Sequence, residues 1–455
     1  MKPLTLKQIA EWSGGRLIRG NPTQPIARVS TDSRGDASGA LFVPLVGERF
    51  DAHAFLPQAF AHGAAAAFSA RPLLESASFP ALIAVDDTLL ALHVLARAYR
   101  ESLAPFISVG VTGSNGKTST KDFLAAVLAR KFNVHATKGN LNNHVGLPLT
   151  VLAADAAHTA GIFEMGMNHF GELAPLCAIA QPDLGVITNI GTAHIEFLGS
   201  REGIAQEKGV LAEAVGADGC VVLNADDDMT PALARRTKAR VITAGLGGGE
   251  VRGENLRGFS FDLVIPGQPV VPVTLPVPGR HMVGNALLAA AAGWRLGLAA
   301  DEIKAGLEAA SVYGGRLQRR EVGGLRFLDD SYNANPDSML AALRTLRELP
   351  VEGRRIAVLG RMGELGPHAA TGHRDVGQAA RTEGVDFLLA VGEDDARLIH
   401  EAFGDPARSL LVEDCEEAAG WLRGHAERAD LILLKGSRSA AMERVLGALE
   451  LPAAS

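Results

Sequence analysis

The residues with the clearest chemistry lie in the segment 111–121, whose sequence is VTGSNGKTSTK. Gly113 and Gly116 let the backbone turn its N–H groups toward phosphate oxygens, and a helix that begins here offers its positive N-terminus. Lys117 would reach the β- and γ-phosphates of a nucleotide, and the Thr118 hydroxyl would bind Mg²⁺. The segment therefore predicts a phosphate-binding loop.

The surroundings of this loop favour the same interpretation. An apolar, β-branched run at 106–111 predicts a buried strand before it, and apolar residues at helical spacing predict a helix after it. One position departs from the general pattern, which has a glycine where this chain has Val111. The shorter spacing G-x-x-G-K-T belongs to a subset of nucleotide-binding proteins. The alternative is a glycine-rich turn before an ordinary helix, but strand, loop and helix in register favour phosphate binding.

Three further side chains could take part in metal chemistry. Glu164 follows the apolar run 161–163, so its carboxylate could hold Mg²⁺ directly or through water, or could simply cap a backbone group. His194 follows another predicted strand and could be a second ligand or a satisfied polar residue, because nothing near it in the sequence has metal-ligand spacing. Lys208 is by default a solvated helix lysine.

An asparagine-rich loop, GNLNNHVGLP, occupies positions 139–148. Asn142 and Asn143 offer both donors and acceptors, which suits a sugar, amide or peptide ligand. Asn and Gly are also the residues expected in an ordinary turn. Both interpretations stay open at the level of the sequence.

The segment DDSYNANPDSM follows a predicted strand in the C-terminal part. Asn335 is expected to cap a helix that begins at Pro336. That cap does not explain Asp329, Asp330 or Tyr332. A carboxylate on a ribose and a ring beside a base are reasonable roles for such residues.

Two other C-terminal segments, GRMGELG at 360–366 and KGSRSAAME at 435–443, also lie between a predicted strand and a predicted helix. Each could bind an anionic group at a helix N-terminus, with Lys435 and Arg438 adding charge. An ordinary connection between strand and helix is the alternative for each.

The elements that must position these residues alternate along the chain. Apolar strands are expected at 161–163, 184–188, 219–223 and 241–243 with helices between them, which predicts a largely parallel sheet covered on both faces. A helix is expected at 89–99, and a small antiparallel appendage at 259–278. Strands at 325–328, 356–359, 387–391, 410–412 and 431–434 predict a second doubly wound sheet, whose ligands would lie beyond the strand C-termini.

Length and composition limit the class of protein. A chain of 455 residues is long enough for about three domains. A net charge of −7 gives no basic surplus for nucleic acid binding. No apolar run approaches the roughly 20 residues that span a bilayer. Three scattered cysteines and no signal-like N-terminus suit a reducing cytoplasm, so we expect a cytoplasmic protein.

Taken in order, these motifs resemble those of the Mur ligases, the ATP-dependent amide-forming enzymes of bacterial peptidoglycan synthesis. The resemblance covers nearly the full chain and rests on the segments TDSR, TGSNGKTSTK, GNLNNHVGLPLT, EMGMNHFGE, TAHIEFLGS, GRHMVGNALLA, DDSYNANPDSM, MGELG and KGSRSAAME. It implies an α/β protein of three domains: a UDP-binding domain at 1–83, a central ATP-binding domain with a phosphate loop at 84–313, and a Rossmann-like domain at 314–455. The motifs DDSYNANPDSM and KGSRSAAME resemble in particular those of the family member that joins D-alanyl-D-alanine to UDP-N-acetylmuramoyl-tripeptide.

The resemblance also implies roles for individual residues. ATP would be bound by Gly113, Ser114, Asn115, Gly116, Lys117, Thr118, Ser119, Asn285 at the adenine, Arg316 at a phosphate, Asp330 at the ribose, and Tyr332. The catalytic residues would be Lys117, Glu164, His194 and Lys208, and two Mg²⁺ ions would be held by Thr118, Glu164, His194 and a carbamylated Lys208. Substrate would contact Ser33 and Arg34 at the UDP, Asn142 and Asn143 at the muramoyl-peptide, and Lys435, Ser437 and Arg438 in the C-terminal domain.

One position departs from the family, because Arg361 stands where relatives usually have Asp.

We expect a monomer that binds neither nucleic acid nor membrane. Two alternatives are weighed against this function. One is a folylpolyglutamate synthase-like ligase with another amino acid substrate. The other is a phosphate-loop switch or transport ATPase, which would leave the asparagine-rich loop unexplained.

Overall fold

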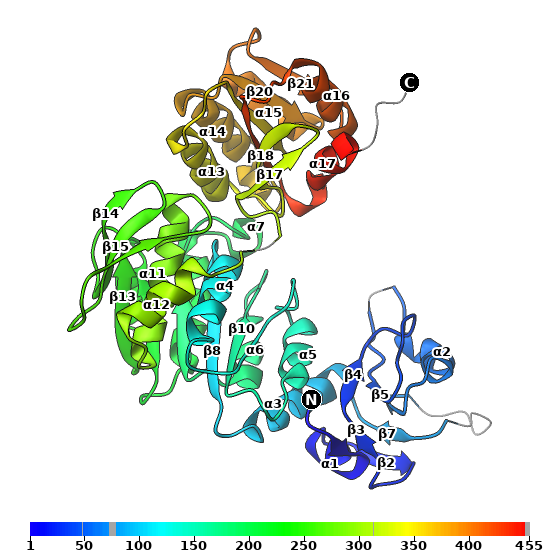
Figure 1. The fold of residues 1–455 in the computed structure, drawn as a ribbon. Helices are drawn as coiled ribbons and strands as arrows, with labels where there is room; N and C mark the ends of the chain where they lie inside the picture. Colours follow the sequence, from blue (N-terminus) through cyan, green and yellow to red (C-terminus); the bar gives the residue numbers. More distant parts are fainter. Residues whose placement is uncertain (48, 72–78, 313, 451–455) are drawn as a thin grey trace.

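The computed structural model describes residues 1–47, 49–71, 79–312 and 314–450. Three large sheets occupy successive parts of the chain, with a two-stranded sheet beside the first, and Figure 1 shows three bodies in a row, coloured from blue through cyan and green to red. Among the described residues, no helix is long and apolar enough to cross a membrane. The three-domain α/β architecture expected of the family is therefore present. The exact domain boundaries stay a prediction.

The N-terminal body is small. Its five-stranded sheet has the order β2-β7-β6-β5-β4, and β1 pairs with β3 beside it. The strands are β1 (Leu4–Thr5), β2 (Arg16–Arg19), β3 (Pro25–Ile26), β4 (Arg28–Ser30), β5 (Ala40–Phe42), β6 (Ala66–Ser69) and β7 (Leu82–Ala84). The helices are α1 (Leu6–Trp12) and α2 (Leu56–Ala61), and the helix α3 (Thr88–Glu101) leads into the central body. Asp87 caps α3 by accepting from the Leu90 N–H, which explains why the helix begins there.

The central body is a nine-stranded sheet with the order β16-β15-β14-β13-β12-β11-β8-β10-β9. The strands β8 to β14 pair in parallel, as predicted. Their bounds are β8 (Ile107–Thr112), β9 (Val134–Ala136), β10 (Ala160–Glu164), β11 (Leu184–Ile187), β12 (Cys220–Asn224), β13 (Arg240–Gly245), β14 (Val251–Arg257), β15 (Ser260–Val264) and β16 (Val271–Thr274). The inner strands β8, β10, β11 and β12 are buried nearly throughout, because helices cover both faces of the sheet there.

Two groups of helices form those layers. One face packs against α4 (Lys117–Leu128), α11 (Arg280–Arg295) and α12 (Ala300–Glu308). The other packs against α3, α5 (Gly146–Ala153), α6 (Leu173–Ala180) and α9 (Val210–Ala214). Short helices α7 (Ile195–Leu198), α8 (Arg201–Lys208) and α10 (Thr230–Ala234) complete the body. The first apolar core continues into the C-terminal body, and the second into the N-terminal body.

The C-terminal body has a six-stranded sheet with the order β17-β18-β22-β19-β20-β21. Its strands are β17 (Gln318–Val322), β18 (Leu325–Asp330), β19 (Arg355–Gly360), β20 (Phe387–Val391), β21 (Ser409–Val412) and β22 (Leu431–Lys435). The helices are α13 (Pro336–Glu348), α14 (Ala369–Thr382), α15 (Asp394–Phe403), α16 (Cys415–His425) and α17 (Glu443–Glu450). All strand pairs are parallel except that of β17 with β18.

Three expectations about the elements need correction. The antiparallel segment at 259–278 is not a separate appendage, because β15 and β16 extend the central sheet through β14. The strand before the phosphate loop begins and ends one residue later than predicted, and α3 begins one residue earlier. The strands β14 and β17 were not predicted. β14 lies inside the central sheet and β17 at the edge of the C-terminal sheet, but both carry charged, partly exposed residues and so lack the continuous apolar run that marks the most buried strands.

Candidate functional site

A cavity of about 1300 Å³ lies where the C-terminal ends of the central strands face the C-terminal body. Parallel sheets place their ligands at this edge. Most of the residues expected to act together line it: Ser114, Asn115, Gly116, Lys117, Thr118, Ser119, Asn142, Asn143, Glu164, His194, Asn285, Arg316, Asp330, Tyr332, Lys435, Ser437 and Arg438. The fold thus brings together side chains that are more than 300 positions apart in the sequence.

Two glycines give the phosphate loop its shape. Gly113 has a φ of +149°, and a Cβ atom there would lie 1.8 Å from the Thr188 hydroxyl. Gly116 has a φ of +79°, and a Cβ atom there would lie 2.4 Å from Asn285 Oδ1. Both positions combine a left-handed backbone with close approach of a neighbour, so both require glycine. The helix α4 begins directly after Gly116, and its N-terminus faces the cavity.

The amine of Lys117 folds back over this loop. It donates to the carbonyl oxygens of Gly113 at 2.8 Å and Ser114 at 3.4 Å. Burial lowers the pKa of Lys117, while the carboxylate of Glu164 opposes that shift. The amine is thus held over the loop, where a bound phosphate would replace the carbonyl oxygens as its partner.

Glu164 and Thr118 form the pair expected of a metal-binding loop. Thr118 Oγ1 donates to Glu164 Oε2 at 2.8 Å, and Asn142 Nδ2 donates to Glu164 Oε1 at 2.8 Å. Glu164 is 2% exposed and ends β10, beside the loop that follows β8. The carboxylate is therefore fixed by two side chains rather than used as a backbone cap. Asn142 joins it from the asparagine-rich loop.

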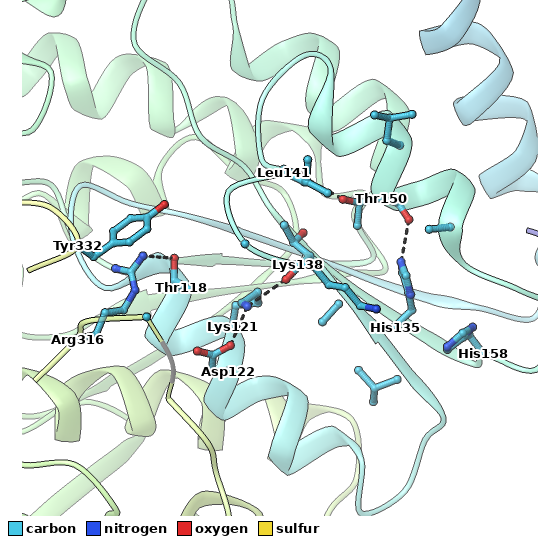
Figure 2. A pocket seen from close by; sticks show the side chains of 17 residues that line it. Thr118, Lys121, Asp122, His135, Lys138, Leu141, Thr150, His158, Arg316 and Tyr332 are labelled. Atoms are coloured by element: carbon cyan, nitrogen blue, oxygen red, sulfur yellow. Dashed lines mark hydrogen bonds and ion pairs between the residues drawn. The ribbon is translucent and has the colours of Figure 1, made fainter. Parts of the chain in front are cut away.

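Arg316 reaches the same group from the connection to the C-terminal body. Its guanidinium donates to Thr118 Oγ1 at 3.0 Å and lies 4.3 Å from the centre of the Tyr332 ring. Figure 2 shows both contacts at the edge of a second cavity, of about 710 Å³, which shares Thr118, Arg316 and Tyr332 with the first. In that second cavity Lys121 pairs with Asp122 at 2.7 Å, so its buried amine is already neutralised.

Lys208 lies close enough to Lys117 and Glu207 for their charges to act on it. Its side chain is fully buried, and among the residues that the structure describes its Nζ has no hydrogen-bond partner. Burial lowers the pKa of Lys208 well below its usual value, and the positive charge of Lys117 lowers it further. Burial thus favours the neutral, nucleophilic form of the amine, and this lysine is not the solvated helix residue that its sequence suggests.

His194 is held by a residue that the sequence did not single out. Its Nδ1 lies 2.6 Å from Glu364 Oε2, in the MGELG segment of the C-terminal body. Burial lowers the pKa of His194, and the contact lowers the pKa of Glu364. Nδ1 makes no hydrogen bond to the described residues, and burial favours the neutral imidazole, which is the form that binds metal ions. Both residues adopt left-handed backbones, with φ values of 65° and 60°. Such strain is typical of functional positions.

The described residues contain no group of three or more His, Cys, Asp or Glu side chains with the geometry of a metal site. The donor set around Glu164 is nevertheless compatible with Mg²⁺, which prefers few protein ligands, carboxylate oxygen among them. The unpartnered amine of Lys208 fits conversion to a carbamate, which would add the anionic oxygens that a free lysine lacks. The residues present therefore fit the expected ions.

Asp330 and Lys435, which also line the cavity, form an ion pair. These residues are register partners at the ends of β18 and β22, and Lys435 Nζ lies 2.6 Å from Asp330 Oδ2. Lys435 also donates to the Asn333 carbonyl at 2.9 Å. Burial raises the pKa of Asp330, and burial together with the Lys435 charge lowers the pKa of His281 to about 4. The predicted ribose and dipeptide residues thus form one ion pair.

The other predicted substrate residues that line the cavity lie in the C-terminal segment 435–443 and in the asparagine-rich loop. Ser437 shares a hydrogen bond with Ser439 at 3.1 Å, and the exposed Arg438 pairs with Glu443 at 2.6 Å. Asn143 accepts from the Val145 and Gly146 N–H groups and so orders the start of α5, while it also lines the cavity. The turn interpretation of the asparagine-rich loop is therefore correct for Asn143 Oδ1. Arg361 is exposed, and its carbonyl accepts from the Ser437 N–H at 2.9 Å.

Ser33 and Arg34 do not join the cavity. They lie in the N-terminal body, where the Ser33 hydroxyl donates to Gln58 at 3.3 Å and Arg34 binds both oxygens of Asp32. The neighbouring His62 ring contacts the Ser33 carbonyl at 2.8 Å. Any ligand that touched both these residues and the cavity would have to extend along the molecule.

Several cavity residues were missed from the sequence. Asn189 accepts from the Asn115 N–H at 2.9 Å, and Asp227 accepts from the Ile190 N–H at 2.6 Å. Asp337 and Glu364 reach across from the C-terminal body. Asn189 and Asp227 follow the predicted strands β11 and β12. The argument used for Glu164, that a polar side chain after a strand can face the ligand site, could therefore have found them. No local signal marks the contacts between the two bodies.

Comparison with known proteins agrees with this geometry. The chain matches the Mur ligase middle domain over residues 111–293 and the Mur ligase glutamate ligase domain over residues 315–438. It is 37% identical to the UDP-N-acetylmuramoyl-tripeptide–D-alanyl-D-alanine ligase of Bacillus subtilis over 97% of both chains. It is also 37% identical to the enzyme of the same name from Escherichia coli K12, over 99% of both chains.

Solved structures give the same result. MurF from Acinetobacter baumannii superimposes with a TM-score of 0.91 at 33% identity, over 99% of both chains. The MurF ligase of Thermotoga maritima in complex with ADP gives a TM-score of 0.82 at 30% identity, over 93% of this chain and 97% of that one. The resemblance inferred from the motifs is confirmed, and the chain belongs to the Mur ligase family, among relatives of the MurF type.

Proposed function

We propose that this protein is an ATP-dependent ligase that joins D-alanyl-D-alanine to UDP-N-acetylmuramoyl-tripeptide, giving a peptidoglycan precursor. The observation that carries the proposal is similarity over the whole chain to ligases with this reaction in their name, together with one cavity that gathers the phosphate loop, Glu164, His194 and the C-terminal loops. The folylpolyglutamate synthase of Mycobacterium tuberculosis shares the fold at 20% identity, which supports no shared substrate.

The first step of the proposed reaction is attack by the terminal carboxylate of the tripeptide on the γ-phosphate of ATP. Lys117 would leave its carbonyl partners and bind the phosphate oxygens, where it offsets the charge that accumulates during transfer. Arg316 lies beside Thr118 with its guanidinium fork available to a second phosphate oxygen. The Asn285 side chain lies against Gly116, where it would meet the adenine.

The second step is attack by the dipeptide amine on the acyl phosphate, followed by loss of phosphate. An acyl phosphate reacts readily with water, so the cavity must be closed while it exists. The C-terminal body supplies Glu364, Tyr332 and Lys435 to the cavity wall and would provide this closure. We propose that Lys435, Ser437 and Arg438 bind the incoming dipeptide from this side.

Two Mg²⁺ ions held by Thr118, Glu164, His194 and the carbamate of Lys208 would neutralise the transferring phosphate. The support for the carbamate is the buried, unpartnered amine whose pKa is lowered, because only the neutral amine reacts with carbon dioxide. Because a carbamate loses carbon dioxide in acid, native mass spectrometry at neutral pH, with bicarbonate and in carbon dioxide-free buffer, would test it. A native mass that does not change with bicarbonate would refute carbamylation.

The remaining proposals concern the UDP moiety, the oligomeric state and the location. We propose that Ser33 and Arg34 bind UDP, that Asn142 and Asn143 contact the muramoyl-peptide, and that the protein acts as a cytoplasmic monomer. Binding of UDP to an Arg34→Ala variant, the mass in solution by light scattering, and cell fractionation would test these in turn.

The decisive experiment measures ADP release and amide product with UDP-muramoyl-tripeptide and D-alanyl-D-alanine, each omitted in turn. A ligase releases ADP at full rate only when both are present and forms one amide for each ADP. Full-rate ADP release without either substrate, with no amide formed when both are present, would refute the ligase and support a switch or transport ATPase. Product formation with glutamate in place of the dipeptide would support the related ligase instead.

A further inference from the structure

The first turn of α13 contacts the central body at two points that the family roles above do not include. Asn335 Nδ2 donates to Asn115 Oδ1 in the phosphate loop at 2.8 Å. Asp337 Oδ2 accepts from both the N–H and the hydroxyl of Thr192, at 2.7 and 2.9 Å. The two contacts lie within three residues of one another on one helix end. Together they fasten the C-terminal body to the loops that follow β8 and β11.

Asn335 does two things with one side chain. Its Oδ1 accepts from the Ser338 N–H at 2.9 Å, which is the helix cap expected from the sequence. The cap uses only the oxygen, and Ser or Asp would serve it equally well. The amide Nδ2 is the atom that reaches Asn115. An asparagine at this position therefore provides a donor that the cap does not need.

The partners of this turn are themselves fixed on the central body. The Asn115 N–H donates to Asn189 at 2.9 Å, and its carbonyl accepts from Asn189 Nδ2 at 3.1 Å, so only its side chain faces α13. The Gly191 N–H donates to the Ser114 hydroxyl at 2.9 Å, which ties the loop after β11 to the phosphate loop. A displacement of one loop therefore shifts the other, because this hydrogen bond joins them.

Close approach of Asp337 also explains why a glycine lies next to Thr192. A Cβ atom at Gly191 would lie 2.4 Å from Asp337 Oδ2. The backbone of Gly191 has no left-handed φ, so alanine would be tolerated there except for this contact. The glycine thus makes room for a side chain of the other body rather than for a turn of its own.

We propose that Asn335 and Asp337 are positioning residues that hold the C-terminal body closed over the phosphate loop, so that the acyl phosphate is passed to the dipeptide amine and not to water. The inference rests on the proposed ligase function. It assigns to the first turn of α13 the coupling between ATP use and amide formation. When the turn is released, the C-terminal body opens more often and water attacks the carbonyl carbon or the phosphorus of the acyl phosphate. The bond from that atom to the bridging oxygen breaks, which regenerates the tripeptide carboxylate and releases phosphate without amide.

The test uses Asn335→Ser, which keeps the cap oxygen and removes the amide donor, and Asp337→Ala, which removes the second contact. The matched control is Asp414→Ser, a cap exchange at α16 in the same body, where Asp414 accepts from the Glu417 N–H. Loss of one hydrogen bond should lower the rate of amide formation about two- to tenfold. ADP release should fall less, so the ratio of ADP to amide should rise in both variants and stay at the parent value in the control.

A change in this ratio separates positioning from damage to the fold, because a loss of folded protein lowers both products equally. Gly191→Ala should raise the ratio as well, and the effects of Gly191→Ala and Asp337→Ala should not add, since both remove the same contact. A second measurement needs no activity. Hydrogen exchange at the Thr192 amide should be slow in the parent and faster in Asp337→Ala.

A parent ratio retained in both Asn335→Ser and Asp337→Ala would refute the positioning role while leaving the ligase function intact. Exchange at Thr192 that is unaffected by Asp337→Ala would also refute it. A parent protein that forms no amide would instead refute the proposed function, and the coupling role with it.

Discussion

The most direct test of the site concerns the stability of the fold with and without the amine of Lys208. This side chain is fully buried, and its Nζ has no hydrogen-bond partner among the described residues. Methionine has a similar length and no polar head. Leaving a buried polar group unpaired costs about 1–3 kcal/mol. We therefore expect Lys208→Met to raise the free energy of unfolding near pH 7 by at least this amount, while it removes ligase activity.

The dependence on pH is a sharper prediction. The pKa of Lys208 is lowered in the fold from its usual 10.5, so the folded state holds a neutral amine where the unfolded state holds a charged one. Unfolding then takes up one proton between the folded-state pKa and 10.5, and stability rises with pH across that window. The parent should gain about 1.4 kcal/mol per pH unit relative to Lys208→Met, and the difference should level off above pH 10.5.

The assay is denaturant unfolding of parent and variant from pH 8 to 10 in carbon dioxide-free buffer, with the same substitution at the exposed Lys7 as the matched control. Because Lys208 lies in the central body, we expect the unfolding transition of that body to depend on pH. Added bicarbonate should stabilise the parent and not the variant, because only the parent can form the carbamate. A difference between parent and Lys208→Met that does not change with pH would refute the neutral buried amine and the argument built on it.

Three further predictions follow from the cavity. Gly116→Ala should abolish binding of an ATP analogue, measured by calorimetry, because its Cβ atom would lie 2.4 Å from Asn285 Oδ1 on a left-handed backbone; full affinity would contradict the loop geometry. Arg316→Lys should lower the ligase kcat/KM about tenfold or more, since a lysine cannot hold Thr118 and a phosphate in one fork; unchanged kinetics would exclude this arginine from the reaction. The imidazole of His281, with a pKa lowered to about 4, should stay neutral in an NMR titration down to pH 5. Because the unfolded ring binds its proton near pH 6.5, the stability of the fold should decrease as the pH drops from 6.5 toward 4. A titration midpoint near 6.5 would show that the ring is solvated.

Local patterns predicted most inner strands of both large sheets, and most of the site residues expected from the motifs line the cavity. The phosphate loop was recognised because its glycines, lysine and threonine must follow one another along the backbone, which is a property of local sequence. The cap at Asn335 was predicted for the same reason, since a cap involves residues within one turn. The strands β14 and β17 were missed because charged residues interrupt their apolar pattern.

The sequence by itself therefore determined the class of fold, the phosphate loop and, through motifs taken in order, the family. Only the tertiary structure decided which side chains hold one another. Lys208 looked like a solvated helix residue and is instead a buried, unpartnered amine. Glu364 contacts His194, and Asn335 contacts Asn115, across 170 and 220 positions of the chain. Burial and pairing between bodies depend on how sheets and helices pack, and no local spacing records that packing.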